Sequence, residues 1–282
     1  MTYKKNKNQG NSNSAKKKVT SKKEKFKAVV KNKNFIWSMV VAVIIVVIIV
    51  IAFAHPFFFA PSSIKPDSYY KISDGDLLPD GHSGIFFLSW LGCPIGATDS
   101  WAIYHGINST TNISGHVELH SALKNDIYSN DITGQPGLLF NGNFTFNYKG
   151  NTFTFYPLYM YNETMTGTVN NGTIHGSLAS YGLSLINSTY PAKVAAMFNK
   201  YATDITYKGH LTTTFIITGP HGTYILNAFM YTPVSGGILG SGSPDPPDWS
   251  PNSPSYVMSH LGSSKTITGA ASTFMSYVGK AA

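Results

Sequence analysis

The chain has 282 residues, which is long enough for one or two domains with a substantial core. Its formal net charge of +8 is unevenly spread, because all 21 basic residues are lysines and twelve of them lie before residue 35, beside one acidic residue, Glu24. That segment carries +11, and the remaining chain, with nine lysines and twelve acidic residues, carries −3. This balance argues against nucleic acid as a partner of the folded part. The single cysteine, Cys93, excludes a disulfide within the chain.

The first 54 residues have the composition of a membrane anchor. Residues 1–34 are rich in Lys, Asn and Ser and predict a disordered cytoplasmic tail. Residues 35–54 carry no charge over about 20 positions, the length that crosses the hydrocarbon of a bilayer. We expect an uncleaved signal anchor with its N-terminus in the cytoplasm. A signal peptide cleaved after Ala52-Phe53-Ala54 is the alternative, against which the long basic region and the long apolar run argue.

The chain beyond the anchor is predicted to lie outside the cytoplasm. Residues 55–79 combine prolines with three phenylalanines and predict a linker, followed by an extracytoplasmic domain at residues 80–282. N-x-S/T sequons occur only after the anchor and not in the Asn-rich tail, which supports this orientation. They give six candidate glycosylation sites: Asn108, Asn112, Asn143, Asn162, Asn171 and Asn187.

The hydrophobic pattern beyond residue 80 mixes strand and helix periods. We expect strands at 85–90 and 116–122, hairpins of 138–148 with 151–161 and of 210–218 with 223–231, and helices at 94–107, 191–201, 255–261 and 266–278. A loop rich in Gly, Ser and Pro fills 236–254. The order is β-α-β, then a β-rich insertion at about 121–190, then α-β-β-α. This order predicts an α/β domain.

The stretch at residues 84–107 carries the clearest chemical signal. An apolar strand is followed by a break at Gly92, the cysteine Cys93, and a helix that starts with Pro94. The first turn of a helix stabilises a thiolate, so Cys93 is a candidate nucleophile. In a C-x-x-C motif a second cysteine resolves the mixed disulfide, but here the fourth position is Gly96. An inert cysteine at a helix start is the other interpretation.

The run W-L-G-C-P-I-G-A-T-D-S-W-A-I-Y resembles the signature of an archaeal family of membrane-anchored, thioredoxin-like proteins of unknown function (domain of unknown function 929). P-G-L-L-F at 136–140 and T-F-I-I-T-G-P-H-G-T-Y-I at 214–225 extend the resemblance over roughly residues 80–282. It implies a thioredoxin-like core carrying the β-rich insertion. It also implies a binding groove formed by Trp90, Pro94, Gly96 and Thr214, with Thr214 where such folds usually carry a cis-proline.

A second group of polar residues alternates in H-V-E-L-H at 116–120. His116, Glu118 and His120 would share one face of a strand, which is conceivable for a metal site. We expect instead that Val117 and Leu119 face the core and leave the three polar side chains in solvent. Cys93 paired with a histidine could form a nucleophilic dyad, but the sequence shows no spatial pairing.

These observations favour a binding or structural module at the cell surface that lacks dithiol redox activity. The alternative is a monothiol thiol–disulfide oxidoreductase that uses Cys93. We expect no cofactor and no metal. The expected partners are the lipid bilayer and other cell-surface proteins, or a mixed-disulfide partner of Cys93. The scarcity of charges and the absence of arginine suggest a surface that faces acid.

Overall fold

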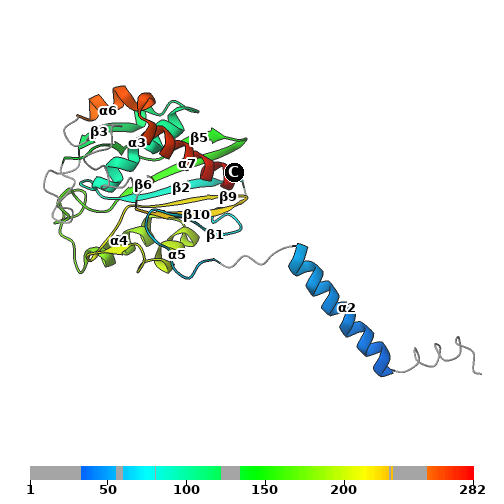
Figure 1. Ribbon diagram of the computed structural model, residues 1–282. Coiled ribbons are helices and arrows are strands. Elements are labelled where there is room, and N and C mark those ends of the chain that lie inside the picture. Colours follow the sequence, from blue (N-terminus) through cyan, green and yellow to red (C-terminus); the bar gives the residue numbers. More distant parts are fainter. Residues whose placement is uncertain (1–32, 55–59, 80, 122–133, 229, 231–252) are drawn as a thin grey trace, which may run out of the picture. The chain divides into compact units, whose positions relative to one another are not determined.

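The computed structural model describes residues 33–54, 60–79, 81–121, 134–228, 230 and 253–282. The chain divides into two compact units, Met1–Phe57 and Phe58–Ala282. In the first unit, α2 (Lys33–Ala54) is a single helix (Figure 1). Within the described part of the chain, no helix combines the length and the apolar character needed to cross a membrane.

The second unit contains ten strands among its described residues, with helices between and after them. Its elements in chain order are β1 (Tyr69–Ser73), β2 (Ser83–Ser89), α3 (Pro94–Asn108), η1 (Ser114–His116), β3 (Val117–Ser121), β4 (Pro136–Phe140), β5 (Phe144–Tyr148), β6 (Asn151–Tyr159), α4 (Leu178–Thr189), α5 (Ala192–Lys200), β7 (Thr206–Tyr207), β8 (His210–Leu211), β9 (Thr214–Gly219), β10 (Gly222–Asn227), α6 (Pro254–His260), η2 (Leu261–Ser263) and α7 (Lys265–Ala281).

Six of these strands form one mixed sheet in the order β1-β10-β9-β2-β6-β5 (Figure 1). The central strand β2 pairs in parallel with β6 and antiparallel with β9, and β9 and β10 form an antiparallel hairpin. Two small sheets, β3-β4 and β7-β8, lie outside it. The observed architecture is therefore α/β with a central mixed sheet, which confirms the predicted fold class at this level.

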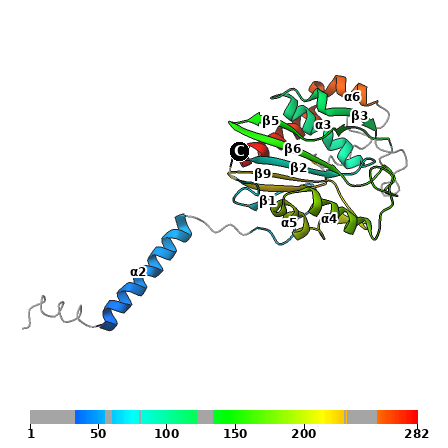
Figure 2. The same ribbon diagram turned by 180° about the vertical axis from the view of Figure 1, so that it is seen from behind.

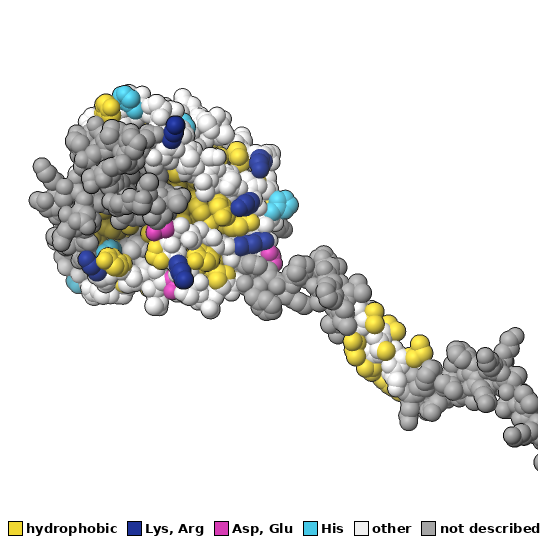
Figure 3. Space-filling model, in the orientation of Figure 1, with side chains coloured by type: hydrophobic (Ala, Val, Ile, Leu, Met, Phe, Trp, Pro, Cys, Tyr) yellow, Lys and Arg dark blue, Asp and Glu magenta, His cyan; other side chains and the backbone are white. Residues whose placement is uncertain are grey.

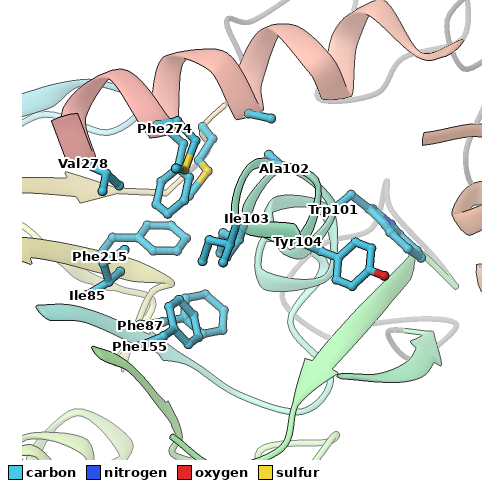
Figure 4. Close-up of a cluster of buried hydrophobic side chains, with 14 of the residues drawn as sticks. Ile85, Phe87, Trp101, Ala102, Ile103, Tyr104, Phe155, Phe215, Phe274 and Val278 are labelled. Atoms are coloured by element: carbon cyan, nitrogen blue, oxygen red, sulfur yellow. The ribbon is translucent and has the colours of Figure 1, made fainter. Parts of the chain in front are cut away.

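Helices cover both faces of the sheet (Figures 1 and 2). Because side chains alternate along a strand, Ile85 and Phe87 of β2 face one cluster with α3 and α7, while Phe86 and Leu88 face the other with α4 and α5. Figure 4 shows the first cluster, where Ile85, Phe87 and Phe155 of the sheet lie beneath α3 and α7. A strand buried on both faces reads as a continuous apolar run, which is why residues 85–88 were recognisable in the sequence.

Most of the predicted elements are confirmed. The hairpin of β5 and β6 turns at Lys149 (φ 48°) and Gly150 (φ 80°), as the Lys-Gly pair indicated. The face of α5 formed by Val194, Ala195 and Phe198 is buried. The loop predicted at 236–254 and the tail at 1–34 lie almost wholly outside the described residues.

Two predicted segments differ in the structure. The strand expected near residue 120 pairs with β4 outside the main sheet, and the parallel neighbour of β2 is β6, inside the range expected as an insertion. Strand β6 can take that central place because Phe153 and Phe155 are fully buried, whereas β3 carries polar side chains at alternate positions. Helix α4 was not predicted, because its Ser- and Asn-rich sequence has few strong helix formers.

The range expected as a linker, 55–79, belongs in part to the folded unit. Strand β1 pairs antiparallel with β10, and Ile64 is only 3% exposed. The Tyr201 hydroxyl donates to the Pro61 carbonyl at 2.9 Å, and the Ile64 N–H donates to the Asp204 carboxylate at 3.0 Å. Residues 60–66 are therefore packed against the turn that follows α5.

We predict that a fragment starting at residue 67 is less stable than one starting at residue 60. The shorter fragment loses the burial of Ile64, about 1.5–3 kcal/mol, and leaves Tyr201 and Asp204 without their partners. Urea unfolding of both fragments measures the difference. Ile64→Ala in the longer fragment should cost about 2–4 kcal/mol. Equal urea midpoints of unfolding for all three proteins would contradict the packing of residues 60–66 against the turn after α5.

Candidate functional site

Cys93 lies in the short connection between the end of β2 and the start of α3. Its backbone is extended (φ −70°, ψ 115°), and it caps the N-terminus of the helix, with Pro94 in the first turn. The Gly96 N–H donates to the Cys93 Sγ at 3.3 Å, which satisfies one of the unpaired donors of the first turn. The prediction of a cysteine and a proline at a helix start is confirmed.

The connection is held from two sides. The Leu91 N–H donates to the Tyr161 carbonyl at 3.2 Å. His120 Nε2 lies 2.8 Å from the Leu91 carbonyl oxygen and 4.0 Å from a carboxylate oxygen of Glu163. A side chain at Gly92 would overlap the backbone oxygen of Glu163, so only glycine permits this close approach. The loop before Cys93 is therefore tightly packed.

The strand that carries His120 does not follow the predicted alternation. Leu119 is 46% exposed and His120 is half-buried, so the expectation that Leu119 faces the core and His120 faces solvent is wrong. The reason is that β3 is the outer strand of a two-stranded sheet whose other strand, β4, packs on α3. Across the described ranges, no group of three or more His, Cys, Asp or Glu side chains is arranged to hold a metal.

Three buried groups form a hydrogen-bonded chain beside the helix start. Cys93 Sγ and Thr213 Oγ1 lie 3.0 Å apart, and Thr213 Oγ1 and Ser89 Oγ also lie 3.0 Å apart. Cys93 is 1% exposed, and Ser89 and Thr213 are fully buried. Ser89 ends β2 and Thr213 directly precedes β9, so the two central strands of the sheet position this chain.

Burial raises the pKa of the Cys93 thiol from 9.0 to about 12, although hydrogen bonds from Thr213 and Gly96 act in the opposite direction. The thiolate is the nucleophilic form of cysteine. At neutral pH the thiol is therefore protonated as well as closed off from solvent. The helix start supplies the expected donors, but the environment lacks the exposure that a reactive cysteine requires.

Gly96, at the position of the missing second cysteine, packs directly against Ser89. A Cβ at residue 96 would overlap Ser89 Oγ and would lie 3.2 Å from Ser89 Cβ and 3.3 Å from Thr213 Oγ1. The serine hydroxyl thus fills the space that a side chain at residue 96 would need. In the sequence, Ser89 is the one polar residue within the apolar run at 85–90, which is the only signal it gave.

The structure places Trp90, Pro94 and Gly96 of the predicted groove beside Cys93, and the Cys93 N–H donates to the Trp90 carbonyl at 3.1 Å. Pro94 and Gly96 flank Cys93 in the first turn of α3. The Thr214 hydroxyl has its acceptors elsewhere: its Oγ1 lies 3.1 Å from the Thr212 carbonyl oxygen and 3.2 Å from Asn227 Oδ1, which share its one hydrogen. The threonine beside the thiol is Thr213, which a run of three threonines in the sequence could not single out.

Trp90 lies next to a buried histidine that the sequence analysis missed. The Trp90 and His210 rings meet edge to face, with centroids 5.0 Å apart. Trp90 Nε1 is buried without a hydrogen-bond partner among the described residues. Burial, with a smaller effect of the Lys208 charge, lowers the pKa of His210 to about 4 despite an opposing backbone hydrogen bond at Lys208, so this imidazole is neutral at pH 7.

A buried carboxyl group, Asp99, lies one and a half turns into α3. One of its oxygens accepts the Met230 N–H at 3.0 Å, and the other has no hydrogen-bond partner among the described residues. Burial raises its pKa well above the ordinary value of 3.8, and the negative charge of Asp67 raises it further. Asp99 was missed because a single acidic residue on a predicted helix normally indicates a solvent-exposed position.

We predict that Gly96→Ala destabilises the domain by about 1–3 kcal/mol, because the new methyl group overlaps Ser89 Oγ. Ser89→Ala should cost about 1 kcal/mol alone, and the double variant should cost less than the sum of the two. Denaturant unfolding measures this cycle. Gly269→Ala, in open space on α7, is the matched control and should be neutral or stabilising. If the free-energy cost of the double variant equals the sum of the two single costs, the expected overlap between the new methyl group and Ser89 Oγ is contradicted.

We predict that Asp99→Asn changes how stability depends on pH. Because the folded pKa is raised, the contribution of Asp99 is fully present below pH 3.8 and is lost as pH rises toward the folded pKa. The asparagine variant should therefore gain stability relative to wild type as pH rises from 4 to 7. Thermal unfolding of both proteins across this range measures the gain. His210 is present in both proteins, so its titration does not contribute to the difference between them. A constant difference would show that Asp99 does not change its protonation on unfolding.

The comparison with known proteins gives a family and no activity. No curated protein and no solved structure matches the chain significantly. A family model described as Domain of unknown function (DUF929) matches residues 68–280, from the residue before β1 nearly to the end of α7. The match includes β2, Cys93, Thr213 and the whole central sheet. Because it covers well over half of the chain, the protein belongs to the DUF929 family.

Proposed function

We propose that the protein is a membrane-anchored, extracytoplasmic domain of thioredoxin-like fold that serves as a binding or structural module and has no dithiol redox activity. One observation carries the proposal that it is not a redox enzyme. The only thiol of the chain is buried, protonated and hydrogen-bonded within the protein, and Ser89 fills the space beside it.

The strand order supports a thioredoxin-like core. Such a core combines a parallel β-α-β unit with an antiparallel hairpin and a final helix, all in one sheet. Here β2, α3 and β6 correspond to the first part, and β9, β10 and α7 to the second, in the spatial order β10-β9-β2-β6. The cysteine lies at the start of the helix that follows the first of these strands, as in redox members of that fold.

The first unit supports anchoring in a lipid bilayer. In α2 the described side chains run from Ile36 to Val46, and the large apolar ones among them are exposed, Trp37 at 69%. Exposed apolar side chains along a helix are stabilised by lipid rather than by water. The uncharged run at 35–54 and the lysines before it support a cytoplasmic N-terminus.

The surface supports exposure to acid. On the face of the second unit drawn in Figure 3, the coloured lysine and acidic side chains are few, and most of the described surface is neutral. A neutral exterior has few carboxylates whose charge is lost when the pH falls. This surface supports placement outside the cytoplasm, facing an acidic medium.

The test is the reactivity of Cys93 in the folded domain. A pKa of about 12 leaves about one thiol in 10⁵ ionised at pH 7. We expect iodoacetamide to label native Cys93 at least about 100-fold more slowly than the urea-unfolded chain. We also expect no dithiol-driven reduction of insulin by the wild-type protein.

Cys93→Ser is the matched control, because a serine hydroxyl can retain the cap on α3 and the contact with Thr213. It should fold with nearly unchanged stability. Turnover by the wild-type protein that this variant abolishes would overturn the binding role and favour the alternative, a monothiol oxidoreductase. The Gly96 N–H, which donates to Sγ, and the Thr213 hydroxyl, which lies 3.0 Å from Sγ, are the observations that keep this alternative open.

A further inference from the structure

The two edges of the main sheet differ in how they are protected against pairing with another chain. A free strand edge offers unpaired backbone groups, and proteins commonly guard it with a bulge or a lysine. Strand β1 has both, with an irregular register between Lys71 and Ser73 and an ion pair of 2.6 Å between Lys71 and Asp74. The other edge, β5, has the sequence F-T-F-N-Y, without charge, proline or bulge.

The residue directly before β5 is the sequon asparagine Asn143. It is exposed, it follows Gly142 in a turn (φ 71°), and Thr145 of the same sequon is also exposed. Phe144 between them is buried and fixes the start of the strand. Figure 2 shows β5 at the margin of the sheet, paired only with β6.

The side chains of the six sequon asparagines are not equally available. Asn162 is half-buried, and its Nδ2 donates to Thr166 Oγ1 at 3.3 Å and to Asn171 Oδ1 at 3.0 Å. In the other four, the side-chain oxygen accepts a hydrogen bond: Asn108, Asn112, Asn171 and Asn187. Asn143 is the one sequon asparagine with neither side-chain atom hydrogen-bonded to a described residue.

We propose that Asn143 carries an N-linked glycan and that this glycan shields the free edge of β5 from a second copy of the chain. The reaction joins Asn143 Nδ2 to the anomeric carbon of a sugar and breaks the bond from that carbon to the phosphate of a lipid-linked donor. The leaving phosphate takes the amide proton. A membrane transferase outside the cytoplasm catalyses the step, so the inference rests on the proposed extracytoplasmic placement.

The first test is the occupancy of each sequon in full-length protein purified from its native membranes. Mass spectrometry of its peptides should find a hexose-containing adduct on Asn143 in wild type and in Thr145→Ser, which keeps the sequon. The adduct should be absent in Thr145→Val, which removes the sequon and keeps a β-branched residue on the strand. Asn162 should be unmodified in all three proteins. Glycans on other sequons with a bare Asn143 would overturn the assignment.

Protease added to intact cells separates the two proposals. If the protease digests the domain and Asn143 carries no glycan, the glycan proposal is overturned while the extracytoplasmic placement stands. If the domain is protected from the protease and none of the six sequons carries a glycan, both proposals are overturned. The shielding role has its own readout, because Thr145→Val and Asn143→Gln should form more dimer than wild type in light scattering of the purified proteins, and Thr145→Ser should not. A glycan on Asn143 together with monomeric variants would overturn the shielding role.

Discussion

The burial of strand β2 on both faces is the constraint on which the rest of the second unit depends. Its alternating side chains fill two separate clusters, one beneath α3 and α7 and one against α4 and α5. A shift of one residue would exchange all of these contacts, so the register is strongly specified. The strand ends at Ser89, and Cys93 follows after a connection that Gly92 allows to pack against Glu163. The position of the thiol is thus a consequence of packing in the sheet.

Two opposing effects act on that thiol, and their magnitudes decide its chemistry. A helix N-terminus stabilises a nearby anion by up to about 2 kcal/mol, or roughly 1.5 pKa units. Full burial shifts a pKa by up to about 3–5 units in the other direction. Burial prevails here, and the pKa of Cys93 rises to about 12. A motif that stabilises a thiolate at a protein surface therefore holds a buried thiol of raised pKa when Ser89 and Thr213 close around it.

The elements that could be predicted from the sequence are those whose signal lies in a short run of neighbouring residues. The apolar run of β2, the Cys-Pro helix start and the Lys-Gly turn were recognisable because each depends on neighbouring residues. Pairings between distant segments were not, so the neighbour of β2 was misplaced and β1 was taken for a linker. Within the site, a one-residue difference between Thr213 and Thr214 depends on strand register. The burial of Asp99 and His210 depends on tertiary packing, which one sequence does not reveal.

These two buried groups give the folded unit a pH response that its sparse surface charges cannot. The contribution of His210 is present above its unfolded pKa of 6.5 and is lost as pH falls toward 4, because the folded interior disfavours the charged imidazole. The contribution of Asp99 has the opposite sign, because the interior favours the neutral carboxyl, and it grows as pH falls toward 3.8. As pH falls, the free-energy cost of burying Asp99 decreases because its carboxyl is then protonated in the unfolded chain as well. The cost of burying His210 increases because its imidazole is then charged in the unfolded chain. Asp99 and His210 therefore contribute to the acid response of the domain with opposite signs.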